Sequence, residues 1–560
     1  MQLDCAGTSV DVTPLLLAEG SEWGLPDSGA TVSAPLGATK RLRASWHGRV
    51  RLLMEADPVP SGWRIRVAVE ALRALRVDAV GVRLRGMEAS RVLVDGYHSW
   101  DWAGTRNAAL SGRGWWGALW GEPDAERHMR ITLAAPPTTG ALSLTWDGNG
   151  TLDAVCRGEP SQAGERTGQA RDLGLALAAG TTLSVDRLDV TAYPVRGVVA
   201  AGLPRVASDP GPRRTGWMSW NCLGAAVTAA DVLEARALVP AGSLILVDDG
   251  WEECWGDWRE STRFGSAIPD LVAELRASGH DTGLWVAPFL VHPQSETAIA
   301  HPDWLLRTAD GEPAVDDRLP RPMWVLDASS PDVVDALWTL GVRLARTGVR
   351  AVKTDFLYAG ATSGARRPGW SGVRALVRGM TALVDGLRSS AARSVAVWAC
   401  GAPGPAVVGI ADACRSGGDA VLRVPNTLER RPEPPTFVHG AAVVRAQTRN
   451  LAARAWLWGG ALPCDVDAVT LGRVGDTPPV DEEVLEPWLE MARRSGGPLL
   501  VSDTPAGLDW ARRQRLREVL DGARGDREHP RDPLSLTPAP MGDDDFLSWA
   551  PDLPVDWEPY

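Results

Sequence analysis

Apolar and polar residues alternate along the first part of the chain. The segments 63–69 and 129–133 place apolar side chains at every second position, and Gly, Pro and Asp residues separate such runs. A period of two is typical of strands that bury one face. The pattern predicts an antiparallel β-sandwich over residues 1–205.

The pattern changes after the Pro- and Gly-containing segment 208–212, which has linker composition. Short continuous apolar runs then alternate with helical periodicity, as expected of βα units. About seven such units predict a (β/α)8 TIM barrel over residues 206–510, with a doubly wound sheet as the alternative. The predicted strands are 215–220, 243–247, 282–288, 350–353, 394–399, 408–412, 461–464 and 498–501, and the predicted helices include 228–239, 268–278, 331–346 and 373–387.

The end of the chain is predicted to be a short C-terminal segment over residues 511–560. A helix is expected near 512–522, followed by a Pro- and Asp-rich tail. This segment has room for a few β-strands but not for another hydrophobic core.

Composition narrows the class of protein. The chain has 560 residues, a formal net charge of −12 and seven cysteines without a C-x-x-C pair. The negative charge disfavours nucleic acid and anionic membranes as partners. The scattered cysteines indicate neither a disulfide framework nor a zinc site. With no leader-like segment or long apolar run, we expect a cytoplasmic protein without a metal, and a homo-oligomer is one of the open possibilities for its assembly.

Two residue biases bear on the chemistry. The only lysines are Lys40 and Lys353, and 26 Trp stand against four Tyr and five Phe. A GC-rich genome favours Arg and Trp, although aromatic faces also stack on sugar rings. Because the chain uses Arg almost everywhere else, Lys353 is a candidate for a position where chemistry requires lysine.

Carboxylates follow three of the predicted barrel strands. Each one alone is also explained as the N-cap of the next helix. Because barrel enzymes carry their chemistry at the C-terminal ends of strands, the three together favour a catalytic site. The carboxylates are Asp248, Asp249, Asp355, Asp412 and Asp419.

Two such carboxylates can cleave a glycosidic bond with retention. One attacks the anomeric carbon while the other, roughly 5 Å away, protonates the leaving oxygen. Lys353 and Asp355 are two positions apart and point to the same face of a strand, where a cation lowers the pKa of a carboxylate. Further candidates are Asp248, Asp249 and Arg415 for sugar hydroxyls, with scaffolding as the alternative, and Trp220, Trp251 and Trp285 for stacking, with core packing as the alternative.

Ordered motifs extend across most of the chain. They are GYHSW (96–100), GWMSW (216–220), VDDGW (247–251), GLWVAPF (283–289), HPDW (301–304), KTDFLYAG (353–360), CGAP (400–403), RSGGD (415–419), GG (496–497) and SD (502–503). In this order and spacing they resemble the melibiase-type α-galactosidases of glycoside hydrolase family 36, in a clan with families 27 and 31.

The resemblance implies removal of terminal α-linked galactose from oligosaccharides, with retention and without a cofactor. It implies that Asp355 is the nucleophile and Asp419 the acid/base. It also implies that the loop 96–100 reaches from the N-terminal domain over the barrel mouth. The substrate-binding residues expected on this basis, together with the aromatic candidates, are Asp248, Asp249, Lys353, Arg415, Trp285, Trp220, Trp100 and Cys400.

Three features depart from the family pattern. The segment 463–467 stands where the family carries an Asn-Asp-Pro-Asp run, Gly417 and Gly418 precede Asp419, and the C-terminal β-domain is curtailed. Alternatives with the same two carboxylates are an α-N-acetylgalactosaminidase and a galactosyl transferase. A sugar-binding homologue without catalysis is an alternative of a different class.

Overall fold

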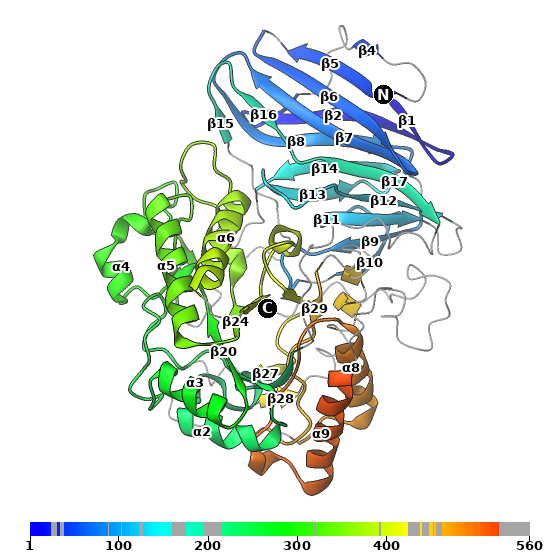
Figure 1. The fold of residues 1–560 in the computed structure, drawn as a ribbon. Helices are drawn as coiled ribbons and strands as arrows, with labels where there is room; N and C mark the ends of the chain where they lie inside the picture. Colours follow the sequence, from blue (N-terminus) through cyan, green and yellow to red (C-terminus); the bar gives the residue numbers. More distant parts are fainter. Residues whose placement is uncertain are drawn as a thin grey trace.

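The computed structural model describes residues 1–23, 31–33, 38–46, 48–87, 89–101, 103–121, 127–158, 175–194, 214–316, 321–390, 394–423, 437–439, 447, 449–451, 453–454, 462–475 and 478–525. Figure 1 shows a broad β-sheet region formed by the N-terminal residues beside a second region, in which helices surround a shorter sheet. The predicted linker 208–212 and the tail 526–560 lie outside the described residues.

The described N-terminal residues contain a 17-stranded antiparallel sheet. Two branches meet at β11, whose first half pairs with β13 and whose second half pairs with β12. One branch continues through β17, β7, β6 and β5, and the other through β14, β8 and β2. The predicted antiparallel character is therefore confirmed. The bounds are β1 Gln2–Cys5, β2 Thr8–Ala18, β3 Ser21–Trp23, β4 Thr31–Ser33, β5 Lys40–Trp46, β6 Val50–Val59, β7 Gly62–Ala71, β8 Leu75–Arg85, β9 Arg91–Asp95, β10 Gly104–Asn107, β11 Gly112–Gly121, β12 Arg127–Leu133, β13 Ala141–Trp146, β14 Thr151–Arg157, β15 Leu175–Leu177, β16 Thr182–Ser184 and β17 Leu188–Pro194.

Alternating burial explains why these residues form strands. In β7, every second side chain from Trp63 to Ala71 is buried, and the residues between them are partly exposed. A strand with this pattern loses its buried face if its register slips by one residue. The sequence pattern therefore fixes both the conformation and the inward face.

Parallel strands form the second sheet, in the order β29, β26, β25, β24, β20, β19, β18, β30. The first strand of this region, β18, pairs with both β19 and the last strand, β30. Isolated bridges from Cys464 to Gly496 and from Val469 to Val501 span the seam between β29 and β30. The sheet is a nearly closed parallel barrel, which an open doubly wound sheet does not produce. The bounds are β18 Thr215–Met218, β19 Leu244–Val247, β20 Asp281–Val286, β24 Ala351–Thr354, β25 Ala396–Ala399, β26 Ala413–Arg415, β29 Cys464–Asp465 and β30 Leu499–Val501.

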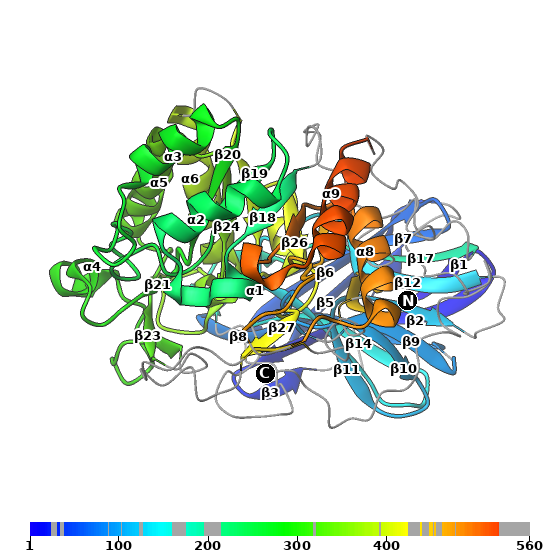
Figure 2. The same cartoon turned by 90° about the horizontal axis from the view of Figure 1, so that it is seen from below.

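Helices pack around the outside of the barrel, with α2, α3, α5 and α6 on one side and α8 and α9 on the other (Figure 2). The predicted helices agree with the structure to within a few residues. Sequence reasoning missed α8, which carries Pro487 inside it, because Pro ordinarily interrupts a helical pattern. The bounds are α1 Trp220–Leu223, α2 Ala229–Ala235, α3 Ile268–Ala277, α4 Glu296–Ala300, α5 Pro331–Thr347, α6 Gly372–Ser390, α8 Glu482–Arg494 and α9 Trp510–Gly525, with short strands β21 Leu290–Val291, β22 Val315–Asp316, β23 Met323–Val325, β27 Val421–Arg423 and β28 Phe437–His439.

One predicted strand is wrong. Residues 408–412 form a turn, with Gly409 at a φ of 84°, and strand β26 begins only at Ala413. A short apolar run does not by itself distinguish a strand from other buried backbone. Asp412 accepts a hydrogen bond at 2.8 Å from the backbone N–H of Val397, near the start of β25. It therefore lies away from the strand ends where the candidate site forms.

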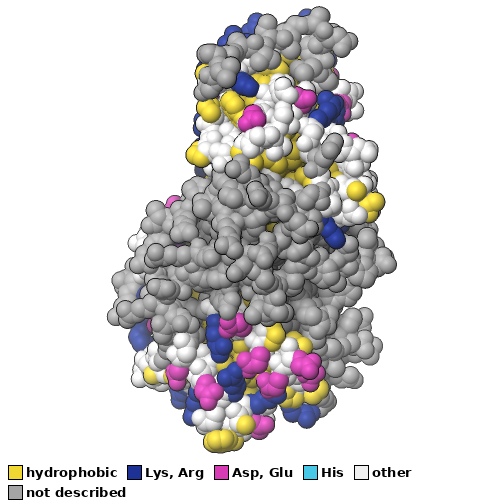
Figure 3. All heavy atoms as spheres, turned by 90° about the vertical axis from the view of Figure 1, so that its right-hand side faces the viewer, with side chains coloured by type: hydrophobic (Ala, Val, Ile, Leu, Met, Phe, Trp, Pro, Cys, Tyr) yellow, Lys and Arg dark blue, Asp and Glu magenta, His cyan; other side chains and the backbone are white. Residues whose placement is uncertain are grey.

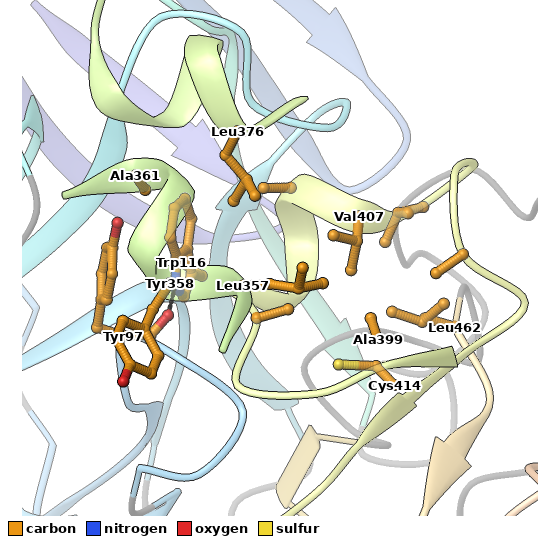
Figure 4. Packing of buried hydrophobic residues seen from close by; sticks show 14 of the residues in the cluster. Tyr97, Trp116, Leu357, Tyr358, Ala361, Leu376, Ala399, Val407, Cys414 and Leu462 are labelled. Atoms are coloured by element: carbon orange, nitrogen blue, oxygen red, sulfur yellow. Dashed lines mark hydrogen bonds between the residues drawn. The ribbon is translucent and has the colours of Figure 1, made fainter. Parts of the chain in front are cut away.

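Hydrophobic side chains join the two regions into one core cluster. Tyr97 and Trp116 of the N-terminal region lie beside Tyr358, which follows β24 (Figure 4). The indole N–H of Trp116 donates to the carbonyl of Tyr97 at 2.7 Å. The same cluster extends to Cys414 in β26. The N-terminal sheet is thus packed against the barrel by buried contacts.

Charged side chains of both signs intermingle on the face where α8 and α9 lie (Figure 3). Arg512 pairs with Glu482 at 3.3 Å, and Arg515 pairs with Glu486 and, at 3.5 Å, with Glu518. Exposed pairs of this kind contribute little to stability. Among the described residues, no helix has the length and apolar character needed to cross a membrane.

Candidate active site

The carboxyl ends of the barrel strands carry the residues that the sequence singled out. Because parallel strands end at the same edge of the barrel, their terminal side chains meet there. In chain order they are Trp220 after β18, Asp248 and Asp249 after β19, Trp285 in β20, Lys353 in β24 with Asp355 after it, Cys400 after β25, and Arg415 in β26 with Asp419 after it.

Lys353 lies between two carboxylates at the centre of this group. Its side chain is 4% exposed, and Nζ lies 2.9 Å from Oδ2 of Asp248 and 3.3 Å from Oδ2 of Asp355. Burial opposes the charge of the ammonium group, but the two carboxylates outweigh burial and raise the pKa of Lys353 well above its usual value. The rare lysine and the candidate nucleophile are therefore in contact.

Asp355 is held as a carboxylate by several donors. The indole N–H of Trp285 donates to Oδ2 at 2.9 Å, and the backbone N–H of Phe356 donates to Oδ1 at 2.8 Å. Burial favours the neutral form, but Lys353 and the hydrogen bonds from Trp285 and Cys400 outweigh it, so the pKa of Asp355 lies below its usual value. A buried carboxylate that stays ionised is suited to nucleophilic attack.

The two aspartates after β19 differ in their surroundings. Asp248 is 1% exposed, and burial raises its pKa to about 6 against the opposing charge of Lys353. Its backbone N–H donates to the Ser219 hydroxyl at 2.9 Å. Asp249 is partly exposed and accepts a hydrogen bond at 3.1 Å from the indole N–H of Trp255. Asp249 is therefore the more accessible of the two, whereas Asp248 faces Lys353.

Asp419 lies in the loop after β26, which is two strands along the sheet from β24. Its Oδ2 accepts from the indole N–H of Trp220 at 2.8 Å, and its Oδ1 lies 3.4 Å from Nη1 of Arg415. Its side chain is 40% exposed, in contrast to that of Asp355 at 8%. The more accessible carboxyl is the one that can exchange protons with water.

The charges of both candidate catalytic carboxylates raise the pKa of the Cys400 thiol. Burial raises the pKa of this thiol well above its usual value, with the charge of Asp355 the next cause and that of Asp419 a smaller one. The charge of Arg415 helps to lower the pKa of Asp355, and its guanidinium forms an ion pair with Asp419. Asp355 and Asp419 thus both lie near Cys400 and Arg415.

Sequence reasoning missed the two aspartates that hold Arg415. The guanidinium is 1% exposed, with Nη2 at 2.8 Å from Oδ1 of Asp467 and Nε at 3.2 Å from Oδ2 of Asp465. Burial opposes its charge, and the carboxylates outweigh burial and raise the pKa of Arg415 above its usual value. Both aspartates are at the end of β29, so the strand-end rule applied to 461–464 would have found them.

Asp467 also anchors the loop that carries Asp419. Its carboxylate accepts hydrogen bonds at 2.7 Å from the backbone N–H groups of Ala420 and Ala468. Gly417 fits closely in the same loop, because a Cβ at this position would lie 2.6 Å from Cγ of Gln447. The segment 463–467 and Gly417, which depart from the family pattern, thus interlock with the structure around Asp419.

Aromatic rings frame the site. Trp100 from the N-terminal region donates from its indole N–H to Sγ of Cys400 at 3.2 Å, and its ring centroid lies 5.2 Å from that of Phe356. Phe356 also lies 5.4 Å from Trp255. The expectation that Trp100 comes near the barrel mouth is confirmed, whereas Phe356 and Trp255 were not predicted. Trp251 is 2% exposed, in keeping with the core-packing alternative.

The loop that carries Trp100 is hydrogen-bonded to the barrel. Ser99 donates from its backbone N–H to the carbonyl of Ala402 at 2.7 Å. Arg454, fully buried, donates to the carbonyls of Ser99 at 2.6 Å and of Ser416, and its Nε lies 3.0 Å from Oδ1 of Asp95. One side chain thus links the N-terminal loop to the segment before Asp419.

The fold and site together define a barrel protein with Asp355 beside a buried lysine, Asp419 after another strand of the same barrel edge, and a framing loop from an N-terminal β region. Residues 234–400 match the family model described as Melibiase. This match supports the resemblance to the melibiase-type α-galactosidases of glycoside hydrolase family 36 that the motifs predicted.

Individual relatives match over shorter stretches. The chain is 33% identical over 131 residues to α-galactosidase AgaA of Geobacillus stearothermophilus, which is 22% of this chain and 17% of that protein. It is 27% identical over 119 residues to an Escherichia coli α-galactosidase, 19% of this chain and 16% of that one. The matched segments are therefore a small part of these curated relatives.

A solved structure supports the fold over most of the chain. The α-galactosidase TtGalA of Thermus thermophilus, in complex with stachyose, superposes with a TM-score of 0.62 at 22% identity, covering 86% of this chain and 99% of that one. At this identity the likeness shows the shared fold. The roles of the individual site residues remain predictions.

Proposed function

We propose that this protein is a retaining glycoside hydrolase that removes terminal α-linked galactose from oligosaccharides. The observation that carries the proposal is the buried, ionised Asp355 in contact with Lys353 at the same edge of the barrel as Asp419. Relatives support the substrate class. The Escherichia coli and Geobacillus stearothermophilus relatives are α-galactosidases, and the structure of TtGalA is a complex with stachyose.

In the proposed first step, Asp355 attacks the anomeric carbon while Asp419 gives its proton to the glycosidic oxygen, which leaves as an alcohol. Asp355 is then esterified to galactose and Asp419 is a carboxylate. In the second step, Asp419 takes a proton from water, the water oxygen attacks the anomeric carbon, and Asp355 is released. The cycle restores both carboxyl groups and needs no cofactor.

Substrate binding is assigned to the residues around this pair. Asp248, Asp249, Lys353 and Arg415 are proposed to bind galactose hydroxyls, since they supply charged donors and acceptors at the pocket. We assign Trp285, Trp220, Trp100 and Cys400 to the walls, with Trp100 nearest the leaving sugar. Binding by Lys353 and Arg415 would compete with their present ion pairs, so these two are expected to orient the aspartates as well.

The domain scheme belongs to the same proposal. We assign residues 1–205 to an N-terminal domain in which the two branches of the antiparallel sheet pack as a β-sandwich, 206–510 to the (β/α)8 catalytic barrel, and 511–560 to a short C-terminal segment. The location is proposed to be cytoplasmic.

Hydrolysis of nitrophenyl glycosides tests the substrate class. We expect the wild-type chain to cleave the α-galactoside faster than the α-glucoside, β-galactoside and α-N-acetylgalactosaminide. Asp355→Ala, as the matched control, should abolish turnover of all four, because no other group can attack the anomeric carbon. Faster cleavage of the N-acetylgalactosaminide, or no cleavage of any of them, would contradict the proposal. The second of these results would favour the sugar-binding alternative.

A further inference from the structure

Asp467 contacts the chain on both sides of Asp419. Its Oδ2 accepts a hydrogen bond at 2.7 Å from the backbone N–H of Ala420, the residue after Asp419. Its Oδ1 lies 2.8 Å from Nη2 of Arg415, which is four residues before Asp419 and whose Nη1 lies 3.4 Å from Oδ1 of Asp419. One carboxylate therefore holds both the backbone after the candidate acid and the guanidinium beside it.

The residues directly before Asp419 cannot anchor its loop through side chains. They are Gly417 and Gly418, and the contact on this side comes from the Gln447 amide, which donates to the carbonyl of Gly418. The position of the loop therefore depends on side chains from other segments, among which Asp467 contributes a charged acceptor. Hydrogen bonds to charged groups are stronger than those between neutral groups.

The conformation of Asp467 is uncommon for a residue other than glycine. Its φ is 69°, in the left-handed region, which Asn and Asp adopt more readily than most residues. Its side chain is 0% exposed, and Oδ1 also accepts at 2.7 Å from the backbone N–H of Ala468. Strained backbone persists where surrounding contacts compensate it, and it clusters at functional sites. This conformation beside a candidate catalytic group favours a functional role over packing alone.

Asn221 closes a ring of hydrogen bonds around Asp419. It is 1% exposed, and its side-chain amide donates to the carbonyl of Ala468 at 2.9 Å and to Oδ2 of Asp467 at 3.4 Å. The preceding residue, Trp220, donates from its indole N–H to Oδ2 of Asp419 at 2.8 Å. The ring runs from helix α1 through Asp467 to the residue after Asp419, and it returns to α1 through the Asp419 side chain.

We propose that Asp467 is a positioning residue for proton transfer by Asp419. The inference rests on the proposed function, in which Asp419 protonates the leaving oxygen and later takes a proton from water. Proton transfer requires the carboxyl to lie within hydrogen-bond reach of that oxygen. Asp467 sets this position by holding Ala420 and Arg415. Asp355 follows another strand and has its own donors, so attack on the anomeric carbon depends much less on Asp467.

Hydrogen exchange tests the contact without any substrate. Asp467→Gly suits the left-handed backbone and lacks the carboxylate. In the full chain, it should speed exchange of the Ala420 amide about 10-fold or more, because a hydrogen bond to a charged acceptor is lost. Mass spectrometry with electron-transfer fragmentation measures this amide.

The matched control for exchange is Asp481→Asn, a change at an exposed aspartate before α8 that makes no capping hydrogen bond through its side chain. Exchange of the Ala420 amide in this variant should equal that of the wild type. Unchanged exchange in Asp467→Gly would overturn the proposal, whether or not the wild type cleaves α-galactosides.

Leaving-group dependence tests the positioning role. Asp467→Asn tolerates the left-handed backbone and keeps one acceptor oxygen, so it also serves if Asp467→Gly does not fold. Its kcat/KM for raffinose should fall about 10-fold or more, whereas that for nitrophenyl α-galactoside should stay within about threefold of wild type, because only proton donation is misplaced. Asp467→Gly should show a larger loss on raffinose with the same asymmetry.

A structural role alone would lower kcat/KM for both substrates in the same proportion, and equal losses in Asp467→Asn would refute the positioning role. Asp481→Asn should match the wild type on both substrates. A wild type without activity on either substrate would contradict the proposed function, while exchange of the Ala420 amide would still decide whether Asp467 holds the loop.

Discussion

Asp355 and Asp419 carry the same functional group in different environments, and that difference supports different roles. Asp355 is buried against Lys353 and the indole N–H of Trp285, whereas Asp419 is 40% exposed beside Arg415 and Trp220. Cationic and donor neighbours around a buried carboxylate favour its charged form. An accessible carboxyl can be reprotonated from water between turnovers.

This contrast predicts how Asp419→Ala responds to the leaving group. Loss of an acid catalyst should reduce kcat/KM for raffinose-type substrates, whose leaving groups are sugars, by about 10²- to 10⁴-fold. Substrates with acidic nitrophenol leaving groups should lose far less, because they depart with little protonation. Steady-state kinetics on both substrate types measure the ratio. Equal losses for good and poor leaving groups would contradict the acid/base role.

Individual site residues were predictable where a local rule applied. The scarcity of lysine and the two-residue spacing located Lys353 and Asp355 together, and strand ends gave Asp248 and Asp249. The ion pairs of Arg415 with Asp465 and Asp467 were not predicted, because a strand end places a side chain at the barrel edge but does not identify its ion-pair partner.

At the scale of elements, the structure depends on a few buried connections between segments distant in sequence. Arg454 is the clearest of them, with contacts to Asp95, Ser99 and Ser416. Burial raises the pKa of Asp95 to about 6 although Arg454 acts to lower it. Removing one member of such a buried pair leaves the other uncompensated.

Arg454→Met should therefore destabilise the folded chain. We expect a loss of about 3–5 kcal/mol in the free energy of unfolding, the range for breaking a buried ion pair. Urea denaturation followed by tryptophan fluorescence measures it. The matched control is Arg388→Met, because the Arg388 side chain is 47% exposed and lies 3.9 Å from its acidic partner. A stability for Arg454→Met equal to that of the control would contradict the proposed link.

Element prediction succeeded where apolar runs were bounded by turns and failed where the signal was ambiguous. The strands β18, β19, β20, β24, β25 and β30 lie within the predicted ranges or extend one residue beyond them. The run 408–412 has strand-like composition, but Gly409 adopts a left-handed conformation and the chain turns there. Helix α8 was not predicted, because Pro487 interrupts its helical pattern. Periodicity indicates only which residues are buried on average. The turn at Gly409 and the helix around Pro487 depend on tertiary contacts, which periodicity does not report.

At the scale of the whole molecule, the N-terminal sheet packs against the barrel at the candidate site. A single hydrophobic cluster spans both regions, and Trp100 reaches Cys400 across their boundary. Periodicity predicted the antiparallel region and the barrel separately. Only the family-like loop 96–100 predicted that the two regions are in contact. Contacts between regions pair surfaces far apart in sequence, so a pattern within either region cannot reveal them.

The central claim is double displacement at an α-galactoside by Asp355 and Asp419, and the configuration of the first product tests it most directly. Proton NMR during hydrolysis of nitrophenyl α-galactoside by the full chain, recorded before mutarotation, resolves the two anomers of galactose. Two inversions at the anomeric carbon predict α-galactose as the initial product. Initial release of β-galactose would mean a single displacement by water and would contradict the account.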